Sequence, residues 1–264
     1  MNRIDATFEG LRHRREKALI TFVTAGDPDM ATTEALVLEM IAQGADLVEL
    51  GVPFSDPMAE GPIIQAASAR ALEAGATLPG IFDLVTRLRS GGVTETPLLL
   101  MMYLNCILHY GKDRFFEACA RAGIDGVIVP DLPYGEQVEI SGEARAHRVH
   151  LISLVAPTSR DRIHAIAQNS EGFLYCVSSL GVTGTRAGFA TDFDAFFGEI
   201  QRHATVPTAV GFGISTPEQA KALAKYAEGV IVGSAVVDLV AKHGTGAAAP
   251  VGAFVKALKN AIRE

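Results

Sequence analysis

The sequence lacks the spacings that mark a metal centre or a disulfide framework. Its three cysteines are far apart, no CxxC pair is present, and none of the seven histidines falls at a metal-ligand spacing. A nucleophile elbow, a Walker phosphate-binding motif and a zinc motif are absent as well. We therefore expect no metal and a reducing, cytoplasmic compartment.

Positive charge is also scarce. The chain has 23 Lys and Arg against 30 Asp and Glu, a net charge of −7, which disfavours nucleic acid or an anionic membrane as a partner. An anionic substrate stays open, because a few backbone amides can outweigh global charge locally. The longest apolar stretch, Pro97 to Leu108, is too short to span a bilayer, and residues 1–17 lack the apolar core of a signal peptide.

Short apolar runs are what the sequence does have, and eight of them alternate with helical segments. The 264 residues suit one barrel, which commonly takes roughly 250 residues. Near-continuous apolar strands are typical of a parallel sheet covered by helices. We therefore predict a (β/α)8 TIM barrel forming a single domain over residues 1–264. The predicted strands are Leu19–Thr24, Leu47–Val52, Leu98–Tyr103, Gly126–Val129, Leu151–Val155, Phe173–Val177, Thr208–Gly211 and Val230–Val232.

Amphipathic segments predict the helices between the strands. Ile4, Phe8 and Leu11 recur at helical spacing and predict an extra N-terminal helix that covers the bottom of the barrel. Asp27 and Thr216 each precede a proline, a pattern typical of helix starts. Further helices are predicted over Thr32–Gln43, Phe115–Ala122, Pro217–Ala227 and Val251–Ile262.

Glu49 is the most informative residue. It lies inside an apolar strand and shares a face with Leu47 and Gly51, opposite Val48 and Leu50. If that face is the inner one, the carboxyl group points into the barrel mouth, where desolvation raises its pKa toward neutrality and suits a general acid/base. The alternative is a buried glutamate satisfied by a structural partner.

A second carboxylate, Glu60, follows a turn-rich loop from Pro53 to Met58. It could bind a donor on the substrate or raise the pKa of Glu49. It could equally be an acid at a helix start, favoured by the helix dipole. Tyr103 and Tyr175, near the ends of their strands, either line a pocket or pack in the core.

Small residues follow the last three strands. The segments Ser179–Arg186, Gly211–Ser215 and Gly233–Ala235 each place glycines where backbone N–H groups can approach a phosphate. The last two segments follow the two strands after which barrels frequently bind phosphate. The alternative is that these glycines only make tight turns. Gly181–Ala187 has the composition of a lid, from which Thr183 could reach an active-site group.

Several motifs together resemble one family, the tryptophan synthase alpha subunit. They are Thr24–Pro28, Leu50–Pro57 after Glu49, Gly181–Gly184 and Gly211–Ser215. The resemblance runs essentially end to end. It implies retro-aldol cleavage of indole-3-glycerol phosphate to indole and glyceraldehyde 3-phosphate, in the last steps of L-tryptophan biosynthesis. It also implies no cofactor on this chain, and a beta subunit that carries pyridoxal phosphate, receives indole through a tunnel and forms an alpha2beta2 heterotetramer with it.

The resemblance also assigns roles to residues. Glu49 is implied as the catalytic acid/base and Glu60 as the carboxylate that binds the indole N–H, where the family typically has aspartate. Thr183 is implied to reach Glu49 as the lid closes, and the loop from Pro53 to Met58 to face the beta subunit. The implied indole pocket is lined by Phe22, Leu100, Tyr103 and Tyr175, and the implied phosphate site consists of Gly184, Gly213, Gly233 and Ser234.

Three other functions share these motifs. The chain could be a stand-alone indole-releasing lyase, a weakly active subunit that mainly activates its partner, or another phosphate-binding barrel enzyme such as an isomerase. The extra methylene of Glu60 supports the second, because a hydrogen bond misplaced by about 1 Å can cost roughly 100-fold in rate.

Overall fold

A ring of parallel strands forms the centre of the molecule. The computed structural model describes residues 1–177, 193–211 and 213–263. All paired strands are parallel, in the order β5-β4-β3-β2-β1-β9-β8-β7-β6. The strands are β1 (Ala18–Thr24), β2 (Leu47–Gly51), β3 (Leu98–Met101), β4 (Gly126–Ile128), β5 (His150–Ile152), β6 (Leu154–Val155), β7 (Leu174–Val177), β8 (Thr208–Gly211) and β9 (Gly229–Val232).

The two ends of this strand order are consecutive in the chain. Ser153 alone separates β5 from β6, and its carbonyl accepts a hydrogen bond of 3.0 Å from the N–H of Tyr175 on β7. The predicted strand Leu151–Val155 is therefore one run that pairs with β4 through its first part and with β7 through its second. Each of the eight predicted apolar runs coincides with a strand position, and the TIM-barrel prediction is confirmed.

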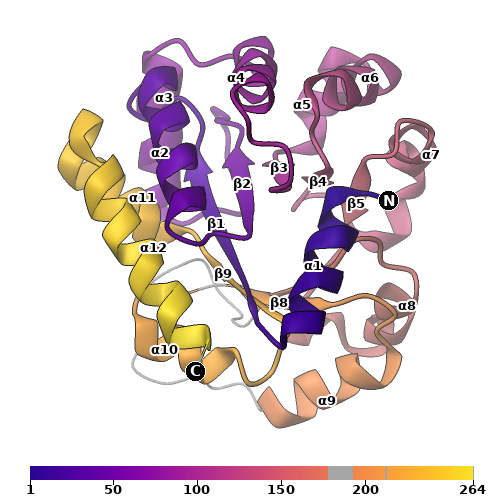
Figure 1. Cartoon of the computed structure of the whole chain (residues 1–264). Coiled ribbons are helices and arrows are strands. Elements are labelled where there is room, and N and C mark those ends of the chain that lie inside the picture. The colour runs from indigo at the N-terminus through magenta and orange to yellow at the C-terminus, as the bar shows by residue number, and fades with distance from the viewer. Residues whose placement is uncertain (178–192, 212, 264) are drawn as a thin grey trace.

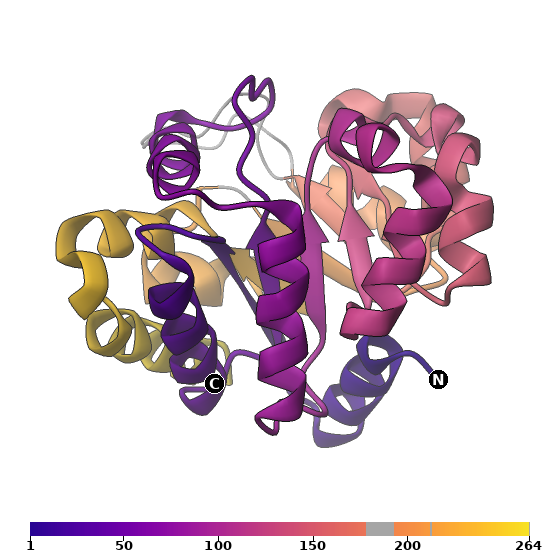
Figure 2. The same ribbon diagram turned by 90° about the horizontal axis from the view of Figure 1, so that it is seen from above.

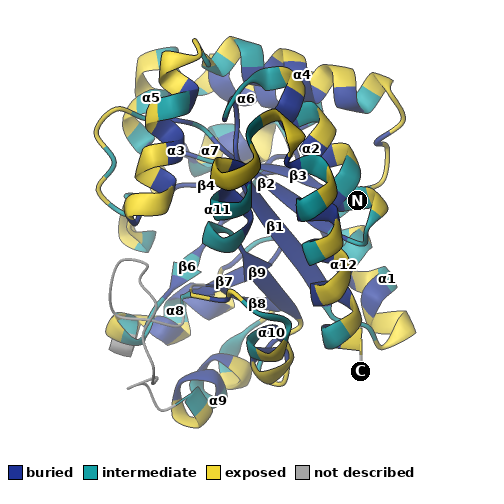
Figure 3. Ribbon diagram, turned by 90° about the vertical axis from the view of Figure 1, so that its left-hand side faces the viewer, coloured by how far each residue is buried: buried dark blue, intermediate teal, exposed yellow. Residues whose placement is uncertain are grey.

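Helices surround the strands (Figure 1) and turn their buried faces toward them (Figure 3). The described helices are α1 (Arg3–Arg14), α2 (Met30–Ala42), α3 (Pro62–Glu73), α4 (Leu78–Ser90), α5 (Leu104–Tyr110), α6 (Lys112–Ala122), α7 (Val138–Ala146), α8 (Ile163–Gln168), α9 (Phe193–His203), α10 (Pro217–Leu223), α11 (Ser234–His243) and α12 (Ala248–Arg263), with 3-10 turns η1 (Tyr134–Glu136), η2 (Pro157–Arg162) and η3 (Gly244–Gly246).

One predicted helix start is confirmed and another is wrong. Thr216 caps α10, since its hydroxyl accepts a hydrogen bond from the N–H of Gln219. Asp27 does not cap α2: Asp29 is the cap, accepting from the N–H of Thr32 at 2.6 Å. Asp27 is instead buried and takes two hydrogen bonds, of 2.8 and 2.7 Å, from the guanidinium of Arg70 on α3. The prediction used Pro28 to place the start of the helix. The capping residue is instead the one whose side chain accepts a hydrogen bond from the first turn, which is Asp29.

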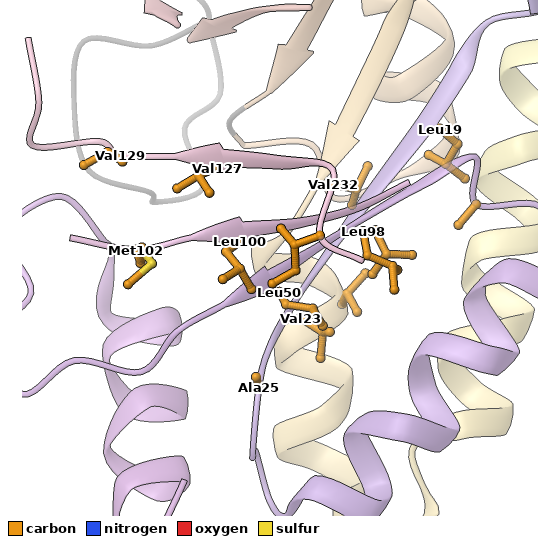
Figure 4. Packing of buried hydrophobic residues seen from close by; sticks show 14 of the residues in the cluster. Leu19, Val23, Ala25, Leu50, Leu98, Leu100, Met102, Val127, Val129 and Val232 are labelled. Carbon is orange, nitrogen blue, oxygen red and sulfur yellow. The ribbon is translucent and has the colours of Figure 1, made fainter. Parts of the chain in front are cut away.

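Two separate apolar clusters lie on the two faces of the strands. The outer cluster joins the strands to the helices and includes Leu50, Leu98 and Leu100 (Figure 4). The inner cluster fills the barrel and includes Ile4, Phe8 and Leu11 of α1. Figure 2 shows α1 at the end of the barrel opposite to the strand arrowheads. The predicted N-terminal helix is confirmed, and it closes the N-terminal end.

Candidate active site

Glu49 points into the barrel. It lies on β2 opposite Phe22 of β1 and Leu99 of β3, and it is fully buried. Its neighbour in alternation, Leu47, belongs to the inner cluster, whereas Val48 and Leu50 belong to the outer one. Because side chains alternate along a strand, the Glu49 carboxyl group shares the inner face.

Burial controls the chemistry of this carboxyl group. It raises the pKa of Glu49 to about 8, because no solvent stabilises the charged form. Both carboxyl oxygens lack a hydrogen-bond partner among the residues that the structure describes. The group is therefore mainly protonated at neutral pH and ready to donate a proton. The expected rise in pKa is confirmed, and the described neighbours offer no structural partner of the kind the alternative requires.

Aromatic rings and glycines surround Glu49. The ring of Phe22 occupies the space over Gly51, where an added Cβ would lie 2.3 Å from the ring. The same ring lies 3.6 Å from where a Cβ on Gly233 would be. Tyr175 is buried, and its hydroxyl lies 2.7 Å from where a Cβ on Gly211 would be. Burial, with a smaller contribution from the charge of Glu49, raises the pKa of Tyr175 well above its usual value. The rings of both residues therefore lie on the inner face, near the carboxyl group.

The last two strands lead into exposed or half-buried backbone. Gly213 follows β8, adopts a φ of +77°, and has no atom within 4 Å of a Cβ position. Gly233 precedes α11, whose first residue is Ser234. The first N–H groups of a helix have no partner inside the helix and are suited to binding an anion. Thr183, Gly184 and the predicted lid Gly181–Ala187 lie outside the described residues.

Glu60 lies beside Tyr103. The tyrosine hydroxyl accepts hydrogen bonds from the N–H groups of Met58 (2.9 Å) and Ala59 (2.8 Å), and it donates one to the Glu60 carboxylate. Burial, chiefly, and the charge of Asp131 raise the pKa of Glu60, whereas the hydrogen bond from Tyr103 lowers it. Glu60 is therefore held in the loop between β2 and α3, at the same end of the barrel as the other candidate residues.

Comparison with known proteins identifies the family. The family model described as "Tryptophan synthase alpha chain" matches residues 8–263. The chain belongs to the tryptophan synthase alpha chain family. Its membership makes it a lyase of tryptophan biosynthesis.

Relatives of the alpha chain family align over nearly the whole length. The alpha chain of Citrifermentans bemidjiense is 50% identical over 264 residues, covering 99% of this chain and 98% of the relative. That of Thermoanaerobacter sp. is 48% identical, covering 92% of each. Among solved structures, tryptophan synthase subunit alpha from Legionella pneumophila superposes with a TM-score of 0.88 at 38% identity, covering 99% and 98% of the two chains.

One residue predicted from the family resemblance is misplaced. Leu100 belongs to the outer cluster and faces the helices (Figure 4), so it lies on the opposite face of β3 from the Glu49 side. Met101, one residue further, is half-buried and packs against both the inner cluster and the small cluster around Phe22. The assignment of Leu100 to the pocket is corrected to Met101, because adjacent side chains on a strand point to opposite faces.

Two further residues near the site were not predicted. Met101 could not be recognised from the sequence, because the residues of β3 are apolar on both faces. The pattern therefore does not show which of them point into the barrel. Asp131 follows β4; its carboxylate accepts the N–H of Leu104 at 3.0 Å. Its place directly after a strand could have indicated it, because functional residues of barrels cluster there.

The described residues show neither a metal-binding cluster nor a membrane-spanning helix. Among them, no His, Cys, Asp or Glu residues form a group of three or more that could hold a metal ion. No helix in the described ranges has the length and apolar character needed to cross a membrane.

Proposed function

We propose that this chain cleaves indole-3-glycerol phosphate to indole and glyceraldehyde 3-phosphate, with Glu49 as the acid/base. The observation that carries the proposal is the fully buried, inward-pointing Glu49 carboxyl group, whose pKa is raised to about 8. A group that is protonated at neutral pH yet loses its proton readily can both donate and accept one during a reaction cycle.

The reaction needs two proton transfers at neighbouring atoms. Glu49 donates its proton to the indole ring carbon that carries the glycerol chain. The carboxylate then accepts the proton of the adjacent glycerol hydroxyl as the carbon–carbon bond breaks, giving the aldehyde and indole and restoring the acid. Glu60 accepts a hydrogen bond from the indole N–H, where positive charge develops.

The two ends of the substrate have different environments. Phe22, Met101 and Tyr175 offer apolar surface for the indole ring, while Gly213 and Gly233–Ser234 offer backbone amides for the phosphate. Together with Gly184 and Thr183, these residues form the proposed substrate site. We expect no cofactor on this chain and propose a cytoplasmic enzyme formed by one domain over residues 1–264.

Exposed apolar side chains support a partner at the same end of the barrel. Met58 is 80% exposed, Leu108 48% and Val138 77%. They follow β2, β3 and β4, which are adjacent in the barrel. Large apolar side chains exposed at one end of a barrel can mark an interaction surface. We propose that the beta subunit, carrying pyridoxal phosphate, binds here and over the loop from Pro53 to Met58, in an alpha2beta2 heterotetramer.

Indole release tests the proposed reaction. The purified chain should release indole from indole-3-glycerol phosphate, and an added beta subunit should increase the rate. Release that the beta subunit leaves unchanged would indicate a stand-alone lyase. No release in either condition would overturn the proposed reaction and leave another phosphate-binding barrel enzyme.

A negative charge at position 138 should weaken binding of the beta subunit. We expect Val138→Glu to weaken binding of the beta subunit by about 30-fold, the effect of losing a buried contact worth about 2 kcal/mol. Calorimetric titration measures the affinity, and sedimentation gives the mass of the complex. Leu38→Glu is the matched control, because Leu38 is 46% exposed on α2, away from this end. Equal affinities for the two variants would exclude Val138 from the interface.

A further inference from the structure

The hydroxyl group of Tyr103 uses its whole hydrogen-bonding capacity on one loop. A phenol has one O–H to donate and oxygen lone pairs to accept with. Here the oxygen accepts from the N–H groups of Met58 and Ala59, at 2.9 and 2.8 Å, and the O–H is donated to Glu60. The Tyr103 ring also packs against Phe54, with 5.1 Å between ring centroids. The hydroxyl therefore has no further donor for a substrate.

Tyr103 is itself held in place. It is 3% exposed and lies between the end of β3 and the start of α5. The next residue, Leu104, donates its N–H to the Asp131 carboxylate. The tyrosine thus ties a loop with little regular structure to a strand and a helix of the barrel, and side chains held by a rigid scaffold keep a site in geometry.

The contact fixes how Glu60 presents its carboxylate. Tyr103 donates its O–H to Oε2, and this contact restrains the orientation of the whole carboxylate, including Oε1. Glutamate is one methylene longer than aspartate, and this length lets the carboxylate reach the tyrosine while the backbone amides of Met58 and Ala59 bind the same hydroxyl. An aspartate on the same backbone would hold its carboxylate one methylene farther back.

We propose that Tyr103 is a positioning residue for Glu60, matched in reach to a glutamate at position 60 rather than to an aspartate. The proposal rests on the proposed function, in which Glu60 binds the indole N–H. Tyr103 acts through Glu60 and does not line the indole pocket with its hydroxyl. The extra methylene is then accommodated by the site and does not by itself indicate a weakly active subunit.

A double-mutant comparison tests the pairing, with indole release as the assay. Tyr103→Phe keeps the ring and removes the hydroxyl. In the native background it should lower kcat about 10-fold, with KM within about 2-fold, the pattern of a misplaced transition-state contact. In a Glu60→Asp background the same change should cost less than about 2-fold, because the pair is already broken. Equal losses in both backgrounds, or no loss in either, would overturn the proposal.

Amide hydrogen exchange gives a readout that does not depend on the reaction. Tyr103→Phe should speed exchange at Met58 and Ala59, whereas Tyr110→Phe, in the aromatic cluster with Phe82 and Phe115, should not. Unchanged exchange at Met58 and Ala59 would show that Tyr103 does not hold the loop. If the native chain released no indole, the proposed function would fail, and the exchange result would still decide whether the Tyr103 hydroxyl holds the loop that carries Glu60.

Discussion

Replacement of Glu49 by glutamine is expected to lower the turnover of indole release by about 10³-fold, the usual size of a general acid/base contribution. Glutamine has almost the same shape but no exchangeable acid proton, so both proton transfers lose their donor and acceptor. Steady-state release of indole from indole-3-glycerol phosphate measures the effect. Turnover within 10-fold of the native value would remove Glu49 from the mechanism.

The glutamine variant should remain folded and bind a phosphate ligand. Circular dichroism and calorimetric titration with glycerol 3-phosphate check both properties. Glu73→Gln is the matched control, because it makes the same chemical change at an exposed position at the end of α3. Its turnover should equal that of the native chain. A parallel loss in both variants would point to a general effect and not to the buried acid.

The same substitution should change how stability depends on pH. The pKa of Glu49 rises from 4.5 to about 8 on folding. Between these two values the unfolded chain gives up this proton while the folded chain keeps it, so stability falls as pH rises through that window. The glutamine variant lacks this loss. Relative to the native chain, its free energy of unfolding should therefore gain about 3–5 kcal/mol between pH 4.5 and pH 8, at 1.36 kcal/mol per unit of pKa shift. Urea unfolding at pH 5 and pH 8 measures it.

Replacement of Asp125 by alanine is expected to destabilise the fold by about 3–5 kcal/mol, because it leaves a largely buried arginine without its counter-charge. The Asp125 carboxylate is 4% exposed and binds Arg3 on α1 at 2.8 Å and Arg89 on α4 at 2.7 Å. It also accepts the N–H of Leu98 at the start of β3, at 2.9 Å. One side chain thus joins two helices and a strand.

Denaturant unfolding compares this variant with an exposed ion pair. Glu34 on α2 binds Arg87 on α4 at 3.0 Å, and the two side chains are 31% and 50% exposed. Glu34→Ala should cost less than about 1 kcal/mol, because water screens such pairs. A loss of under 1 kcal/mol for Asp125→Ala as well would show that Arg89 finds enough other partners, such as the carbonyl groups of Val93 and Thr96.

The strands and the inward direction of Glu49 could be predicted because both depend on short-range pattern. A strand of an enclosed barrel is apolar over its length, and alternation assigns each side chain to one of two faces once a single residue is placed. The charge of Glu49 supplied that marker on β2. On β3, where Leu99, Leu100 and Met101 are all apolar, no residue supplied one, and the pocket position was placed one residue too early.

Contacts between distant segments could not be predicted. Tyr103 is 43 residues from Glu60, and Asp125 is 122 residues from Arg3. Neither pair follows a period of a helix or a strand, so nothing in the sequence around either residue points to the other. The wrong start of α2 has a related cause, since Asp27 was read as a local cap while its carboxylate is bound by Arg70, on another helix.

The packing of α1 into the N-terminal end of the barrel leaves the C-terminal end as the open one. Ile4, Phe8 and Leu11 fill the N-terminal end, so the substrate enters and the products leave through the C-terminal end. In the proposed reaction Glu49 recovers its proton from the glycerol hydroxyl of the substrate, so only the substrate and the two products have to pass the open end in each cycle. A second protein seated over the rim would then receive the product before bulk water does.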